Sequence, residues 1–104
     1  MIPWTVTAHT NTHPDNGILL AGATDNYTAA HHAAGEAALA ALDDLAGHEP
    51  TAIPFICISI DDNPLLLAAA AADSNNTVDF AGFAAVIAHV RDTGTPYEPA
   101  QTSW

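Results

Sequence analysis

Histidine and aspartate side chains are the groups in this chain best suited to chemistry, because imidazole and carboxylate both bind divalent metals. The chain has six histidines, and His9 and His13 lie four residues apart on an extended segment that runs into a loop. Asp61 and Asp62 follow an apolar segment, where ligands often bind in α/β sheets. These four residues are therefore candidate metal ligands, and the two aspartates are also a candidate acid–base pair.

The same residues have a plainer interpretation, which we prefer. The spacing of His9 and His13 fixes no ligand geometry outside a helix, and the chain has no His-Glu-x-x-His or Cys-x-x-Cys pattern. Asp62 or Asn63 is suited to cap a helix that begins at a proline, while Asp61 favours the positive end of that helix. In this interpretation the histidines are surface residues and the aspartates cap a helix, and none of them binds a metal.

No other residue pattern is typical of catalysis. Cys57 lies between isoleucines in an apolar segment, where burial raises rather than lowers the pKa of a thiol. The serines lie in no Gly-x-Ser-x-Gly sequence, and no glycine-rich phosphate loop is present. His31 lies at the edge of a helical apolar stripe and is either a half-buried imidazole or a ligand. We expect no cofactor, and a binding role fits the sequence better than enzyme activity does.

The charge balance is the strongest signal. One cation, Arg91, stands against twelve carboxylates, so the formal net charge is −11. Charged residues make up 12% of the chain, whereas about 25% of both signs is usual. The imbalance therefore reflects missing cations rather than added anions. Direct binding of DNA, RNA or an anionic membrane is excluded as a function, because each needs a basic surface.

A protein without cations repels no basic partner, so we expect a non-enzymatic acidic protein that docks on a basic protein. An inhibitor, an immunity-type protein or a phage anti-defence or accessory protein would fit this description. The expected contact residues are carboxylates on one helix face and large rings near the two chain ends: Glu36, Asp43, Asp44, Trp4, Tyr97 and Trp104. A terminal segment that folds back, so that the tryptophans seal the core, is the alternative for the rings.

The hydrophobic patterning predicts six elements that must position these residues. Asn11–Gly17 is expected to be a turn, because Asn-Gly suits a chain reversal. Asn63 before Pro64 predicts a helix N-cap followed by proline at the first helical position. In chain order the elements are strands Trp4–Thr10 and Ile18–Ala23, a helix Asn26–Ala46 capped by Thr24 or Asp25 and ended by Gly47, a central strand Phe55–Ile60 covered on both faces, a helix Leu65–Ala72, and a helix from a cap at Thr77 to Arg91.

The fold class is therefore α+β, with a small mixed sheet of about three strands covered by helices in the order β-β-α-β-α-α. We expect residues 1–104 to form a single domain, with an irregular C-terminal tail over residues 94–104. Lacking a visible signal peptide or a long apolar segment, the protein is expected to be cytoplasmic. A thin sheet with open edges favours a homodimer, so a self-assembling structural protein is an alternative to the acidic binding protein, as is a small metal-binding protein or enzyme.

Overall fold

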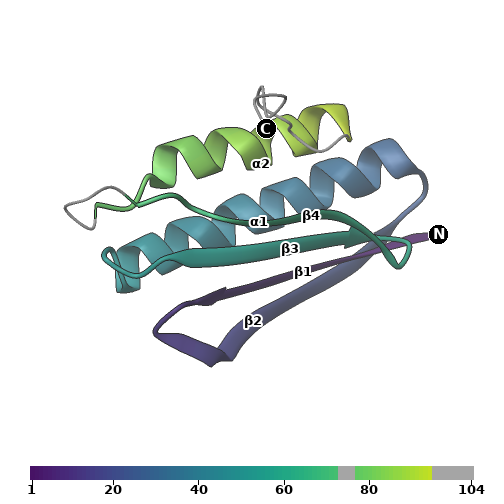
Figure 1. The fold of residues 1–104 in the computed structure, drawn as a ribbon. Helices are drawn as coiled ribbons and strands as arrows, with labels where there is room; N and C mark the ends of the chain where they lie inside the picture. Colours follow the sequence, from purple (N-terminus) through teal and green to yellow (C-terminus); the bar gives the residue numbers. More distant parts are fainter. Residues whose placement is uncertain (73–76, 95–104) are drawn as a thin grey trace, which may run out of the picture.

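Residues 1–72 and 77–94 are described in a computed structural model, with only the backbone described at residues 13–16. The element order is β-β-α-β-β-α (Figure 1). The elements are β1 (Ile2–Thr10), β2 (His13–Thr24), α1 (Tyr27–His48), β3 (Pro54–Ile60), β4 (Asn63–Ala69) and α2 (Phe80–Thr93).

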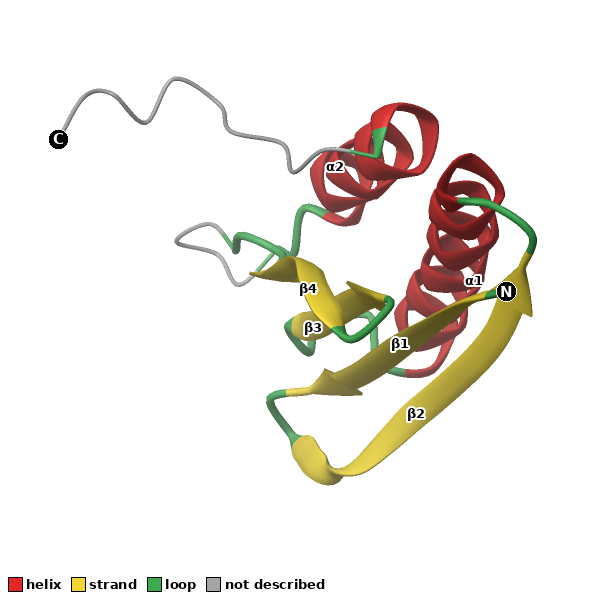
Figure 2. Ribbon diagram, turned by 90° about the vertical axis from the view of Figure 1, so that its right-hand side faces the viewer, coloured by secondary structure: helices red, strands yellow, loops and turns green. Residues whose placement is uncertain are grey.

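The four strands form one sheet in the order β2-β1-β3-β4, and each neighbouring pair is antiparallel. The α+β class is confirmed, whereas the expectation of a mixed sheet with three strands is wrong. Both helices lie on the same side of the sheet (Figure 2). The inner position of β3 agrees with the sequence, but helices cover only one of its two faces, so the predicted double cover is wrong.

The helix predicted over Leu65–Ala72 is wrong, because β4 occupies Asn63–Ala69 as an edge strand. A short apolar segment cannot be assigned to helix or strand from periodicity alone. The Asn63-Pro64 pair, which suggested a helix cap, lies instead at the start of this strand, where proline is tolerated because an edge strand does not need every backbone donor. Asn63 pairs with Ile60 of β3.

The chain reverses between β3 and β4 through a tight turn at Asp61 and Asp62. Asp61 and Asp62 have φ angles of 53° and 64°, and the residues on either side of them are paired. Two central residues with positive φ are typical of the type I′ turn that joins antiparallel strands. The two aspartates are therefore turn residues, and the interpretation of them as helix caps is wrong because no helix follows.

The first hairpin is also tighter than expected. Thr10 pairs with His13, so Asn11 and Thr12 alone separate β1 from β2, and the expected turn at Asn16-Gly17 lies within β2. The Asn11 side chain accepts a hydrogen bond of 2.9 Å from the backbone N–H of Ile53. This bond holds the two-residue turn against the segment before β3. The chain therefore reverses at Asn11 and Thr12 and not at Asn16-Gly17.

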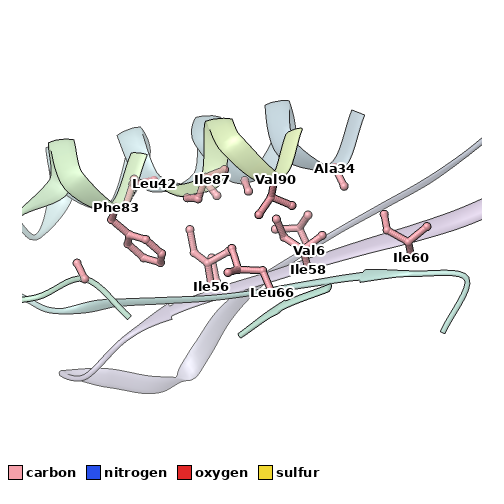
Figure 3. Packing of buried hydrophobic residues seen from close by; sticks show 14 of the residues in the cluster. Val6, Ala34, Leu42, Ile56, Ile58, Ile60, Leu66, Phe83, Ile87 and Val90 are labelled. Carbon is pink, nitrogen blue, oxygen red and sulfur yellow. The ribbon is translucent and has the colours of Figure 1, made fainter. Parts of the chain in front are cut away.

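The core lies between the sheet and the two helices. Strand β3 buries every second residue, and Ile56 and Ile58 are fully buried. Figure 3 shows these side chains facing Ile87 and Val90 of α2. Helix α1 contributes mainly small side chains, which allow it to lie close to the strands. Its buried residues are Ala30, Ala34, Gly35, Ala38, Ala41 and Leu42.

Both helices begin at caps other than those expected. Asn26 accepts a hydrogen bond of 2.8 Å from the backbone N–H of Ala29 at the start of α1, and Asp79 accepts one of 2.9 Å from that of Gly82 at the start of α2. Each cap lies one or two residues beyond the predicted Thr24, Asp25 or Thr77. All of these residue types cap helices well, so composition alone did not distinguish the positions.

Candidate functional site

The outer surface formed by α1 and α2, called here the helix layer, holds the three carboxylates predicted on the acidic helix face. Glu36, Asp43 and Asp44 are all exposed on α1. The two helices run antiparallel. Gly35 in the first half of α1 lies against Arg91 near the end of α2, whereas Ala46 near the end of α1 lines the same pocket as Phe80 at the start of α2. The structure therefore places the second half of α1 beside the first half of α2.

Arg91, the single cation of the sequence, is bound by two carboxylates. Its guanidinium Nε and Nη2 donate to the two carboxylate oxygens of Asp92 at 2.8 and 3.2 Å, and Nη1 donates to Glu36 Oε2 at 3.0 Å. These contacts raise the pKa of Arg91 and lower the pKa of Asp92 through the hydrogen bonds and the opposite charges. The helix layer thus neutralises its own arginine, a contact that sequence spacing could not show because Glu36 lies on the other helix.

The other two carboxylates differ from each other. His48 Nδ1 lies 3.4 Å from Asp44 Oδ1, an ion pair when the imidazole is protonated, and 2.9 Å from the Asp44 backbone oxygen. The pKa of His48 is raised by that hydrogen bond and by the Asp44 charge. Asp43 makes no hydrogen bond or ion pair with any residue that the structure describes. Its charge is therefore available to a partner.

Asp43 borders a cavity between the two helices. The cavity has a volume of about 280 Å³ and is otherwise lined by apolar side chains, including Leu39 and Leu42 of α1 and Phe80 and Ala84 of α2. One carboxylate at the rim of an apolar depression is an arrangement that suits a side chain with an apolar stem and a cationic end. The sequence placed Asp43 on a solvated acidic face but gave no sign of the depression.

Glu49, which follows α1, has a structural role. Its two carboxylate oxygens accept hydrogen bonds from Thr12 Oγ1 at 2.6 Å and Thr10 Oγ1 at 3.0 Å. Thr10 is buried, with 2% of its surface exposed. These bonds join the end of α1 to Thr12 in the β1–β2 turn and to Thr10 at the end of β1, which lie 37 and 39 residues away in sequence.

The candidate metal ligands lie at opposite ends of the sheet. His9 pairs with Phe55 at the start of β3, and the rings stack with centroids 5.1 Å apart. Asp61 and Asp62 follow the far end of β3, about 20 Å away at about 3.3 Å per strand residue. The side chain of His13 lies outside the described residues. Across residues 1–72 and 77–94, no group of three or more potential ligands is close enough to hold a metal ion.

Asp61 has a specific partner on α1. Tyr27 Oη donates a hydrogen bond of 2.9 Å to Asp61 Oδ2. This bond, with the nearby negative charge, raises the pKa of the Tyr27 hydroxyl. His31 lies one turn after Tyr27, with ring centroids 6.4 Å apart, and is half-buried against Gly94 at the end of α2. The aspartate and the histidine thus connect secondary-structure elements.

Of the three ring residues predicted to contact a partner, only Trp4 can be placed. It is half-buried on the helix side of β1 and packs against the core. Its ring covers Gly22 of β2, where an added Cβ would lie 2.6 Å from Trp4 Cζ2. Trp4 therefore packs on the core side of the sheet. Tyr97 and Trp104 lie outside the described residues.

A second candidate surface, absent from the sequence predictions, is the side of the sheet that faces away from the helices, called here the open sheet face. Strand alternation places Leu19, Thr7, Cys57 and Leu67 side by side across the four strands on this face. Leu19 is 67% exposed and Leu67 is 81% exposed. The register of four strands, which no single segment reveals, brings these residues together.

Comparisons with family models, curated proteins and solved structures find no match for the chain. None of the helices in the described part of the chain is long and apolar enough to cross a membrane. The function must therefore be argued from the two surfaces, the helix layer and the open sheet face.

Proposed function

We propose that this chain is a non-enzymatic binding protein whose helix layer docks on a basic protein. The observation that supports the proposal is the pairing of Arg91 with Glu36 and Asp92, because it leaves no unpaired lysine or arginine on the described residues. A surface with one sign of charge attracts the opposite sign at long range and speeds association. The same surface disfavours acidic partners, so it contributes selectivity as well as rate.

The cavity beside Asp43 gives this docking surface a centre. Interfaces depend on a few anchors that fill depressions and are surrounded by weaker polar contacts. A lysine or arginine of the partner would lay its aliphatic stem against Leu39 and Phe80 and place its cationic end near Asp43. Asp44 would add attraction from the rim, where solvent screens each charge.

Proteins that act in this way include inhibitors, immunity-type proteins and phage anti-defence or accessory proteins. A protein of this kind would occupy a basic surface of its target without catalysing a reaction. Trp4, Tyr97 and Trp104 stay predicted contacts, which the described residues do not test. The metal-binding and enzymatic alternatives gain no support from the placement of His9, Asp61 and Asp62.

The test is capture of a basic partner and measurement of its affinity. The immobilised full chain is exposed to lysate of the source cell at low ionic strength, and captured proteins are eluted with a salt gradient and identified. The affinity of the purified partner is then measured for the wild type and for a D43N/D44N double variant. We expect the double variant to bind at least about tenfold more weakly, which corresponds to about 1.4 kcal/mol.

A D25N/D62N double variant is the matched control, because it removes two exposed carboxylates away from the helix layer. Its affinity should fall by less than about threefold, since charges beyond a screening length of about 8 Å contribute little at physiological salt. Equal losses in the two double variants would show attraction by net charge without docking on the helix layer. Failure to capture any basic protein at low salt would contradict the proposal itself.

A further inference from the structure

The open sheet face differs from ordinary solvent-facing sheet surfaces in its chemistry. Antiparallel sheets with one covered face usually place polar and charged side chains on the other. Here every carboxylate with a described side chain belongs to a helix, a cap, a turn or a loop rather than to the open sheet face. The residues of that face whose side chains are described include no aspartate, glutamate, lysine or arginine: Pro3, Thr5, Thr7, His9, Leu19, Ala21, Ala23, Phe55, Cys57, Ser59, Pro64, Leu67 and Ala69.

We infer that the open sheet face packs against the same face of a second copy of this chain. Burying Leu19 and Leu67, the most exposed leucines, would remove apolar surface from water. A two-fold axis requires one patch to be complementary to itself, and a neutral, nearly flat sheet face meets that requirement. Two sheets packed face to face lie about 10 Å apart with their strands within about 30° of each other.

The distribution of charge favours a second copy of the chain as the partner of the open sheet face. Two copies with a net charge of −11 each repel one another wherever their carboxylates approach. Among the described side chains, those of the open sheet face are where that repulsion is weakest, because none of them is a carboxylate. A basic protein would instead gain its attraction at the helix layer. The two surfaces therefore suit different partners, and both can be occupied at once.

The available area is sufficient for a reversible dimer. The strands are 7 to 12 residues long. At about 3.3 Å per residue and about 4.8 Å between strands, the four strands present a footprint of roughly 500 Å². Two such faces bury roughly 1,000 Å², which is the lower limit for a specific interface. We therefore expect a dimer that dissociates on dilution.

Sedimentation velocity of the full chain over roughly 5 to 500 μM tests the inference at low and high salt. We expect a dimer that strengthens as salt rises, because salt screens the repulsion between the two copies and leaves apolar burial intact. Binding to a basic partner should weaken over the same range. The opposite salt dependences separate failure of the dimer from failure of the proposed function. A monomer at every concentration and both salt levels would overturn the inference.

A charge placed within the open sheet face identifies the interface. Thr7 lies on the inner strand β1, so Thr7→Glu should weaken dimerisation at least tenfold whatever the angle between the sheets. Thr51→Glu, the same change in an exposed loop, should leave dimerisation within about twofold of the wild type. Leu67→Glu is the second face variant, because an 81% exposed side chain tolerates substitution without loss of the fold. If Thr7→Glu and Leu67→Glu dimerise as well as Thr51→Glu, pairing occurs elsewhere, such as through a strand edge, and the inference is overturned.

Discussion

The two faces of the sheet are built from the same four strands and differ in almost every physical respect. The covered face presents Val6, Ile56 and Ile58, which are fully buried beneath the helices. The open sheet face presents threonines, alanines and small polar residues, with Leu19 and Leu67 as its exposed apolar groups. Strand alternation makes this division possible, because successive side chains point to opposite faces.

The difference separates the residues on which fold stability depends from the surfaces proposed for association. Fold stability depends on the covered face, where packing is dense and each methyl group matters. The carboxylates lie on helices, turns and loops, where they affect long-range attraction more than packing. We expect the open sheet face to contribute little to the folding of a single copy, which leaves its residues available for the proposed dimer.

The largest difference in the free energy of unfolding is expected between one apolar truncation on the covered face and one on the open sheet face. Ile58→Ala on the covered face should lower the free energy of unfolding by about 2–5 kcal/mol, because it leaves a cavity in the core. Leu67→Ala on the open sheet face should change it by less than about 0.5 kcal/mol at concentrations where the chain is a monomer. Urea denaturation of both variants measures the contrast.

A loss above about 1 kcal/mol for Leu67→Ala in the monomer would show that the open sheet face has an intramolecular cover. Equal losses in Ile58→Ala and Leu67→Ala would remove the distinction between the faces altogether.

Much of the covered face could be predicted from the sequence. The alternation in Trp4–Thr10 and the continuous apolar segment at Phe55–Ile60 correctly predict the two inner strands, and both long helices are predicted within a few residues. These signals are local, because periodicity and composition within one segment determine them. The same reasoning failed for the alanine-rich segment after Pro64, which is a strand and not a helix. Its assignment to a strand depends on the turn made by the positive φ angles of Asp61 and Asp62.

The candidate sites could be predicted only in part. The sequence identified the exposed carboxylates Asp43 and Asp44, because helical spacing separates them from the apolar stripe. It could not show the pairing of Glu36 with Arg91, which lies 55 residues away. The row from Leu19 to Leu67 depends on the register of four strands, so it requires the complete sheet. Contacts distant in sequence account for what was missed.

A change of intermediate size is expected in the free energy of unfolding when two glycines of α1 are replaced by alanine. The comparison tests how closely α1 and α2 pack in the helix layer. At Gly35 an added Cβ would lie 2.7 Å from Arg91 Cγ and 2.8 Å from Arg91 Cα, whereas at Gly47 it would meet nothing within 4 Å. Gly35→Ala should therefore destabilise the protein by about 1–3 kcal/mol through overpacking between the helices. Gly47→Ala should stabilise it by about 0.5–1 kcal/mol, because alanine favours the helix.

Thermal or urea unfolding of the two glycine variants measures this difference in sign. The prediction also sharpens the proposed function, since a Gly35→Ala variant that separates α1 from α2 would disturb the cavity beside Asp43. Stabilisation by both substitutions would mean that the helices are not in close contact, and the shape of the helix layer would then need revision.

The smallest expected effect concerns the contact between Tyr27 of α1 and Asp61, in the turn at one end of the sheet. Because the fold raises the pKa of the Tyr27 hydroxyl above its ordinary value of about 10, the contact stabilises the fold fully below pH 10. This contribution is lost as the pH rises through the folded pKa, where the hydroxyl loses its proton. Tyr27→Phe should therefore lower the urea midpoint slightly between pH 7 and 9, by less than Gly47→Ala raises it, and the difference from the wild type should shrink toward pH 11. A difference that persists unchanged at pH 11 would assign the loss to packing of the ring and not to the hydrogen bond that joins the helix layer to the sheet.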